Sequence, residues 1–206
     1  MLPDEIEKRS FAIIEEEAGD HGFPPDQWPI VARMIHTSAD FDYLATVRFH
    51  PDAVRAGLSA IRAGGPVFTD TNMALSGLRK RDLGMFGCGM RCLIADNDVM
   101  KTARETGVTR AQAAVDLAVD DMDGGIYVVG NAPTALLRLI EHVESGRARP
   151  ALVVGLPVGF VNAAESKDAL TALNVPHITN VGRKGGSNVA AAVVNALVIM
   201  ANQAGK

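Results

Sequence analysis

The chain has 206 residues, of which 48% are hydrophobic, 5% aromatic and 21% charged. The hydrophobic fraction excludes an intrinsically disordered chain. A net charge of −4, from 20 basic and 24 acidic residues, argues against a nonspecific nucleic-acid binder, which carries a basic excess. Domains average about 150 residues, so we expect one domain over residues 1–206.

Targeting and metal-binding patterns are absent from the sequence. The N-terminus has no apolar signal region, and the most apolar stretch, Val189–Ala201, is shorter than the ~20 residues that span a bilayer. We therefore expect no membrane segment and a cytoplasmic location. Cys88 and Cys92 are too few for a disulfide framework or a four-ligand metal site, so we predict no metal.

The first 65 residues show helical periodicity. The apolar spacing, Pro and Gly positions predict three helices: one ending near Ala18, one from after Asp26 towards His36, and one between Pro51–Asp52 and Gly64–Gly65. We expect this helical N-terminal stretch to pack on the rest of the same domain.

From residue 66 the pattern alternates between short apolar runs and longer amphipathic segments. The predicted strands are Pro66–Thr69, Arg91–Ala95, Ile126–Val129, Ala151–Val154 and His177–Thr179. The predicted helices are Val99–Glu105, Ala111–Asp121, Ala135–Glu144, Ala164–Leu173 and Asn188–Asn202. This alternation predicts an α/β fold with a mostly parallel, Rossmann-like sheet of about five strands between two helical layers.

Three glycine-bearing loops follow predicted strands: Gly130–Ala135, Gly155–Phe160 and Gly182–Ser187. In open parallel sheets ligands bind at the carboxyl ends of the strands. Each loop leads into a predicted helix, whose first N–H groups attract anions. We therefore expect a site for a molecule with several carboxylates or phosphates, although each loop taken alone is also explained as an ordinary turn. The known nucleotide-binding glycine signatures are absent.

His36 stands out among five histidines because Asp40 follows four residues later. If the turn stays helical, Asp40 would orient the imidazole or shift its pKa. On composition alone, the competing interpretation is that His36 only caps the end of its helix.

Several motifs together resemble the precorrin-8X methylmutase family, in the family's order and over nearly the whole chain. The histidine motif is Arg33–Asp42, and the further matching segments are Arg9–Phe11, Thr69–Ala74, Thr109–Arg110, the three glycine loops and Val161–Lys167. Asp70–Gly77 and Gly182–Val189 resemble the anaerobic branch, which acts on a cobalt-containing substrate. The metal of such a substrate needs no protein ligand, so the residues leave both substrate forms open.

The resemblance implies an isomerase that moves a methyl group from carbon 11 to carbon 12 of a corrin-type macrocycle in vitamin B12 biosynthesis. Such an isomerisation needs no redox cofactor. The family's catalytic histidine corresponds to His36. Protonating the conjugated ring makes the receiving carbon electron-poor, and a histidine can hold and release that proton near neutral pH.

The resemblance also implies a polycarboxylate tetrapyrrole as the small-molecule partner and a homodimer with the site near the subunit interface. The substrate-binding residues carried over from it are Ser10, Thr71, Arg110, Asn131, Arg183 and Ser187. Their hydroxyl, amide and guanidinium groups suit carboxylates.

Two other hypotheses compete with an isomerase. One is a tetrapyrrole carrier of the same fold without turnover, and the presence of His36 argues against it because a carrier needs no proton donor. The other is an unrelated enzyme that uses a nucleotide, and the missing phosphate signatures argue against that class.

Overall fold

The computed structural model describes residues 2–203. Within them, the strands are β1 Val47–Phe49, β2 Val67–Thr69, β3 Met90–Arg91, β4 Ile126–Val129, β5 Leu152–Gly155 and β6 His177–Asn180. The helices are α1 Pro3–Ala18, α2 Trp28–Ser38, α3 Tyr43–Thr46, α4 Ala53–Arg62, α5 Asn72–Gly77, α6 Lys80–Met85, α7 Asn97–Thr106, α8 Arg110–Ala118, α9 Pro133–Glu144, α10 Ala163–Thr171 and α11 Ser187–Gln203.

The described strands form one sheet in the order β1-β6-β5-β4-β2-β3. All neighbours pair in parallel except β1, which runs antiparallel to β6 with Val47 opposite Asn180. The sheet therefore has six strands, where the sequence predicts about five. The missed strand, β1, is three residues long, too short to show any hydrophobic period.

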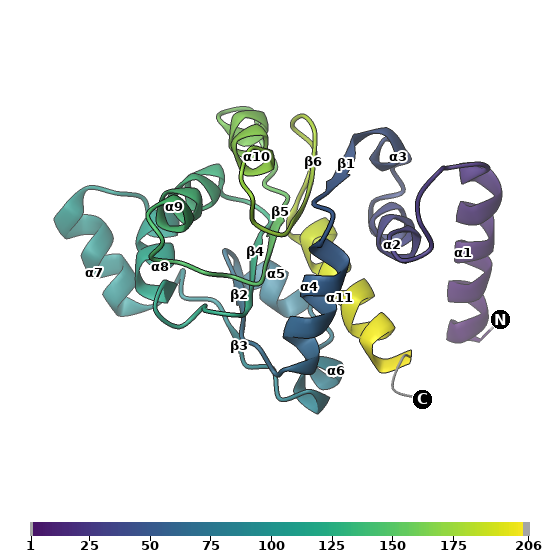
Figure 1. Ribbon diagram of the computed structural model, residues 1–206, viewed down its shortest axis with the longest axis horizontal. Helices are drawn as coiled ribbons and strands as arrows, with labels where there is room; N and C mark the ends of the chain where they lie inside the picture. Colours follow the sequence, from purple (N-terminus) through teal and green to yellow (C-terminus); the bar gives the residue numbers. More distant parts are fainter. Residues whose placement is uncertain (1, 204–206) are drawn as a thin grey trace.

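Helices cover both faces of the sheet, which confirms the three-layer α/β/α arrangement (Figure 1). Along β4, Ile126 and Val128 pack into the core beneath α2, α4 and α11, whereas Tyr127 and Val129 pack into the core beneath α7–α10. The side chains of β4 enter the two cores alternately because successive side chains of a strand point to opposite faces of the sheet. A continuous apolar run is thus the expected signature of a strand buried on both faces.

Most predicted boundaries lie within two or three residues of the observed ones, and the main error concerns β3. The sequence predicts a strand over Arg91–Ala95, but pairing ends at Arg91. The chain then turns, with the N–H of Asp96 donating to the carbonyl of Leu93, and Leu93 is buried in the core beneath α7–α10. Because the buried Leu93 lies in this turn, the segment Arg91–Ala95 has the apolar character that is typical of a strand.

The apolar C-terminal stretch is a central helix of the fold. Most of α11 is buried, and it packs against α2, α4 and α5. None of the helices in residues 2–203 combines the length and the apolarity that crossing a membrane requires. Helix α1 packs on α2 at the outside of this layer (Figure 1).

Candidate functional site

The sheet brings the predicted loops to one edge. Because β2, β4, β5 and β6 are parallel, their carboxyl ends lie on the same side, which we call the carboxyl edge. From this edge the chain enters α5, α9, α10 and α11. Of the predicted binding residues, Thr71, Asn131, Arg183 and Ser187 lie on these connections.

Two predicted binding residues, Thr71 and Ser187, contact each other. Thr71 caps α5 by accepting the Ala74 N–H at 3.0 Å, and its hydroxyl lies 2.8 Å from that of Ser187. A Cβ on Gly130 would lie 2.6 Å from the Ser187 Cα, so only glycine allows this approach. The connections after β2, β4 and β6 therefore meet at one point.

Asp70, which the sequence reasoning missed as a functional residue, organises the connection after β4. Its carboxylate is 2% exposed and accepts the N–H groups of Gly130, Asn131 and Ala132 at 2.9, 2.8 and 2.7 Å. Burial raises the pKa of Asp70, and the three N–H groups oppose that rise. The signal available in the sequence was an aspartate directly after a buried strand.

Asp70 also corrects one expectation. The sequence predicts that the N–H groups of the Gly130–Ala135 loop bind anions, but the first three donate to Asp70 instead. They are not free to bind a ligand, and the carboxylate behind them repels a second one. Asn131 can reach a substrate only through its side chain.

His36 is exposed near the end of α2 and stacks on Phe11 of α1. The two rings are 4.8 Å apart and inclined by 12°. The Arg33 guanidinium lies 5.0 Å from the centre of the same Phe11 ring. A pocket of about 190 Å³, the His36 pocket, is lined by Arg33, His36, Thr37, Gly77, Asn188, Ala191, Ala192 and Asn195.

The His36 pocket adjoins the carboxyl edge. The Asn188 amide donates to the carbonyl of Thr37 at 3.5 Å, which joins the end of α2 to the first turn of α11. Ser187, which contacts Thr71, is the residue before Asn188. The tertiary structure thus places the predicted catalytic histidine beside the predicted binding loops.

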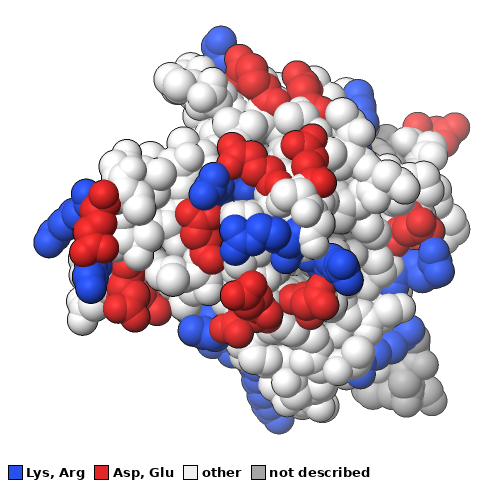
Figure 2. All heavy atoms as spheres, turned by 60° about the vertical axis from the view of Figure 1, so that its left-hand side comes forward, with Lys and Arg blue, Asp and Glu red and all other residues white. Residues whose placement is uncertain are grey.

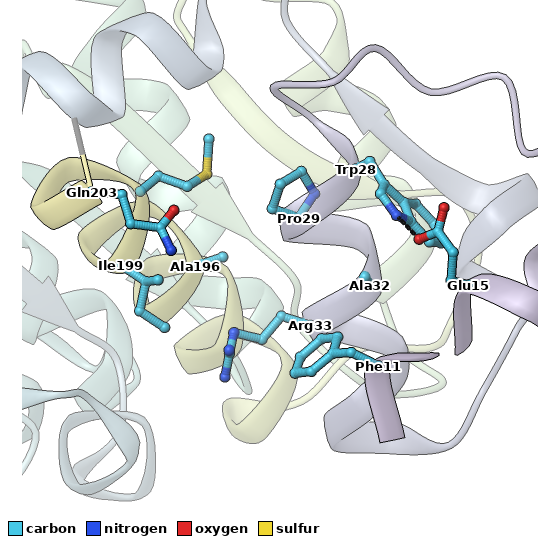
Figure 3. A pocket seen from close by; sticks show the side chains of 10 residues that line it. Phe11, Glu15, Trp28, Pro29, Ala32, Arg33, Ala196, Ile199 and Gln203 are labelled. Carbon is cyan, nitrogen blue, oxygen red and sulfur yellow. Dashed lines mark hydrogen bonds between the residues drawn. The ribbon is translucent and has the colours of Figure 1, made fainter. Parts of the chain in front are cut away.

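A larger apolar groove of about 310 Å³ extends from Phe11 and Arg33 between α1, α2 and α11 (Figure 3). Its walls include Trp28, whose indole N–H donates to Glu15 at 2.5 Å, and Gln203. Arg33 lines both cavities, and Phe11, which lines the groove, stacks on His36, so the groove and the His36 pocket adjoin.

Asp40 does not perform the role that the sequence suggests. Its carboxylate accepts the Lys184 ammonium at 2.6 Å and the N–H of Asp42 at 3.0 Å, and Lys184 also bonds Asp42 at 2.5 Å. Hydrogen bonding to Lys184 lowers the pKa of Asp40. Ala39 adopts a left-handed conformation that ends α2, so the helical spacing needed for an Asp40–His36 pair is lost.

Two further predicted residues, Ser10 and Arg110, lie on α1 and at the first residue of α8. The Ser10 hydroxyl donates to the Ile6 carbonyl at 2.9 Å, one residue before Phe11. Arg110 is exposed at the start of α8, where the preceding Thr109 contacts Thr134 of α9 at 3.2 Å. Its helix start therefore lies beside the connection after β4.

Arg183 is exposed after β6, and its guanidinium lies 5.5 Å from the centre of the Phe160 ring. The loops after β5 and β6 also contact through the N–H of Gly159, which donates to the Arg183 carbonyl at 3.2 Å. Phe160 is 83% exposed and Val161 is 78% exposed. The edge thus combines a cation with uncovered apolar side chains.

Away from the site, acidic and basic residues alternate on the α7–α9 side of the molecule, which Figure 2 turns towards the viewer. Arg138 of α9 bonds Asp116 of α8 at 2.6 Å, and His142 contacts the same carboxylate at 2.6 Å. Within residues 2–203, no cluster of three His, Cys, Asp or Glu residues is arranged to hold a metal ion.

Comparison with known proteins identifies the family. The family described as precorrin-8X methylmutase matches residues 5–200. This chain belongs to the precorrin-8X methylmutase family. Members of the family are isomerases of cobalamin biosynthesis, so the chain is an isomerase.

Individual methylmutases match over almost the full length. The cobalt-precorrin-8 methylmutase of Priestia megaterium is 50% identical over 202 residues, covering 98% of this chain and 90% of the relative. The cobalt-precorrin-8 methylmutase of Salmonella typhimurium is 48% identical, with 95% and 94% covered. The precorrin-8X methylmutase of Pseudomonas aeruginosa is 40% identical, with 93% of each chain covered.

Solved structures agree with the family assignment. The precorrin-8X methylmutase of Thermus thermophilus superposes with a TM-score of 0.91, at 48% identity and with 98% of both chains covered. A precorrin-8X methylmutase related protein superposes with a TM-score of 0.84 at 27% identity, covering 92% of this chain and 99% of that one. The α/β arrangement described above is therefore the methylmutase fold.

Proposed function

We propose that this methylmutase acts on cobalt-precorrin-8, moving the methyl group of carbon 11 to carbon 12 of the macrocycle. The support is that the curated relatives of 50% and 48% identity are both named cobalt-precorrin-8 methylmutases, whereas the curated precorrin-8X methylmutase of Pseudomonas aeruginosa is 40% identical. The Thermus thermophilus structure, at 48% identity, carries the name precorrin-8X methylmutase, so the experiment below compares both substrate forms. The cobalt belongs to the substrate, and the reaction is an isomerisation that consumes no cofactor.

In this proposal, His36 is the general acid of the methyl transfer. Its exposed ring lines the pocket beside the carboxyl edge, and stacking on Phe11 holds the plane of the imidazole. A proton placed on the conjugated ring system withdraws electrons from carbon 12, to which the methyl group migrates with its bonding pair. The proton returns to the imidazole when conjugation is restored, so acid and base are the same group.

The substrate carboxylates bind around His36. Arg183 and Arg110 supply charged donors, and Ser10, Thr71, Asn131 and Ser187 supply hydroxyl and amide groups. Lys184 is excluded from this role because two carboxylates already hold it. Several carboxylates held at once fix the macrocycle so that its reacting edge faces His36.

The working form is a homodimer of one-domain chains. The His36 pocket, about 190 Å³, is smaller than the roughly 300–1,000 Å³ of typical ligand sites, so it accommodates only one edge of a tetrapyrrole. The exposed Phe160 and Val161 beside Arg183 are suited to contact with a second chain. We place the enzyme in the cytoplasm, which the unpaired thiols of Cys88 and Cys92 support.

The single observation that carries the proposal is the position of His36 at the pocket that joins α2 to the carboxyl edge. The test is incubation of the purified protein with precorrin-8 with and without cobalt, followed by absorbance spectra. Conversion to the spectrum of the cobyrinic acid skeleton is expected, faster with cobalt. Binding without conversion would show a carrier, and faster conversion of the cobalt-free form would assign the chain to the other substrate.

A further inference from the structure

A buried ammonium group lies under the carboxyl edge. Lys167 of α10 is 1% exposed, and among residues 2–203 no carboxylate forms an ion pair with it. Its Nζ donates to the carbonyl of Lys184 at 2.7 Å and to Oδ1 of Asn180 at 3.1 Å. Burying an unpaired charge is unfavourable, and two neutral acceptors could be satisfied by a neutral donor. The charge itself therefore needs an explanation.

The Lys184 carbonyl, which accepts the Lys167 ammonium, belongs to the loop between β6 and α11. The carbonyl of Lys184 also accepts a hydrogen bond from the Asn180 side-chain amide at 3.0 Å, so two donors fix the orientation of this carbonyl. The described chain has no cis peptide bond, and the N–H of a trans peptide points opposite to its carbonyl. The N–H of Gly185 is therefore directed away from Lys167.

Four backbone N–H groups of this loop have no acceptor within the described part of the chain. Within residues 2–203, no acceptor is bonded to the N–H of Gly182, Arg183, Lys184 or Gly185. A Cβ on Gly185 would lie 2.3 Å from the carbonyl oxygen of Leu156, so the loop is held tightly against the connection after β5. This arrangement contrasts with the loop after β4, whose N–H groups Asp70 occupies.

Within residues 2–203, the other cations of the loop do not bond the Lys184 carbonyl. The side chain of Lys184 is held by Asp40 and Asp42, and Arg183 lies over Phe160. A cation bonded to the carbonyl of a peptide draws electrons from it, which makes the N–H at its other end a stronger donor. The charge of Lys167 is thereby transmitted through one peptide to the carboxyl edge.

We propose that Lys167 is a positioning residue for substrate binding: it orients and polarises the Lys184–Gly185 peptide so that the free N–H groups of residues 182–185 bind a substrate carboxylate. This inference rests on the proposed function, which supplies the polycarboxylate. Lys167 does not touch the substrate and takes no part in proton transfer.

The test compares Lys167→Gln and Lys167→Met, with Lys101→Gln on the remote helix α7 as the control. Cobyrinic acid is titrated into each protein, and KM and kcat are measured with cobalt-precorrin-8. Lys167→Gln keeps a donor but removes the charge. We expect both Lys167 variants to raise KM and the dissociation constant about tenfold while kcat stays within twofold. Wild-type binding by Lys167→Gln would reduce Lys167 to a neutral structural donor.

A second measurement uses the wild-type protein alone, so it does not depend on the folding of a variant. Burial lowers the pKa of Lys167 to about 8, with Asp168 opposing this shift. Of the charged groups around it, Lys184 keeps its charge over this pH range because bonding to Asp40 and Asp42 raises its pKa, and Arg183 lies over Phe160. Wild-type affinity for cobyrinic acid should therefore fall as pH rises from 7 to 9. Affinity that is constant over this range would overturn the inference.

These outcomes separate the inference from the proposed function. If the wild-type protein binds no cobyrinic acid and converts no substrate, the proposed function fails. If the wild-type protein does both and the Lys167 variants match it, only the role of Lys167 fails.

Discussion

The predicted site residues and their neighbours fall into two kinds: groups bonded within the protein and exposed groups left free for a ligand. Lys184, Asp40 and Asp42 form a closed bridge, and Asp70 is saturated by three N–H groups. His36, Arg183 and Arg110 remain exposed. The exposed groups are one imidazole and two guanidinium groups, which are suited to the acid-catalysed reaction of a polycarboxylate that we propose.

His36→Ala should remove isomerase activity by a factor of about 100 or more, because loss of a general acid typically costs 10²–10⁴-fold. The exposed ring fills no core position, so thermal unfolding should be nearly unchanged. The control is His50→Ala, at the end of β1 and therefore at the opposite edge of the sheet. Residual activity above a few per cent of wild type would contradict the assignment.

Arg110→Ala and Arg183→Ala should each weaken binding of cobyrinic acid about tenfold or more, since one charged hydrogen bond contributes about 1.5–3 kcal/mol. Arg62→Ala, in the last turn of α4 before β2, serves as the control because that turn leads to the other edge of the sheet. Calorimetric titration of the three variants decides the matter. Unchanged dissociation constants would show that both arginines are solvated surface residues without a role in binding.

At the scale of elements, buried and half-buried charges join neighbouring connections and helices. Asp70 links the ends of β2 and β4, and Lys167 links α10 to the loop after β6. Asp116 joins α8 to α9 through Arg138 and His142. Each of these groups bonds residues distant in sequence, so each controls the relative position of two elements.

Asp70→Asn should destabilise the fold and loosen the connection after β4. The amide retains one acceptor oxygen and places an NH₂ group against backbone donors, leaving at least one buried N–H unsatisfied. That costs about 2 kcal/mol, or a fall in Tm of roughly 4–8 °C for a chain of this size. Asp123→Asn, at an exposed position, is the matched control. Equal unfolding temperatures for both variants would mean that the loop orders itself without Asp70.

Asp116→Asn should make the free energy of unfolding depend less on pH in the acid range. Burial raises the pKa of Asp116, but bonding to Arg138 and His142 outweighs it and lowers the pKa below the ordinary value. A lowered carboxyl pKa stabilises the fold above about pH 4 and loses this effect as pH falls through the folded value. The difference in Tm between wild type and variant should be largest near pH 7 and shrink towards pH 3. A constant difference would point to packing instead of charge.

At the scale of the whole molecule, one sheet and its two helical layers hold every predicted site residue. The cores on the two faces share the strands β4 and β5, so neither face can unfold alone without exposing the other. The site itself is open, with uncovered apolar side chains at its rim. An open site of this kind suits a chain that completes its cavity with a second copy.

Sedimentation at micromolar concentration should therefore give about twice the 21.8 kDa mass of one chain, and heating should give a single unfolding transition. Phe160→Ser should shift the mass towards one chain without changing the spectrum of the folded protein. A wild-type monomer would remove the dimer from the proposal and leave Phe160 as a wall for the macrocycle.

The sequence alone determined the elements that are long and periodic. The strand Ile126–Val129 and the helices α9 and α11 were predictable, because both faces of a buried strand and the core-facing side of a helix must be apolar. The clustering of three glycine loops at one edge followed from parallel topology. The motif around His36 indicated the family, which the comparisons confirmed.

Only the tertiary structure decided how charges are paired. Asp40 lies four residues from His36 in sequence, yet it bonds Lys184, which is 144 positions away. Asp70 takes the N–H groups that the sequence assigned to a ligand, and the short β1 forms only because β6 is there to pair with it. Ion pairs and short strands depend on distances set by the packing of remote elements, and local spacing carries no record of those distances.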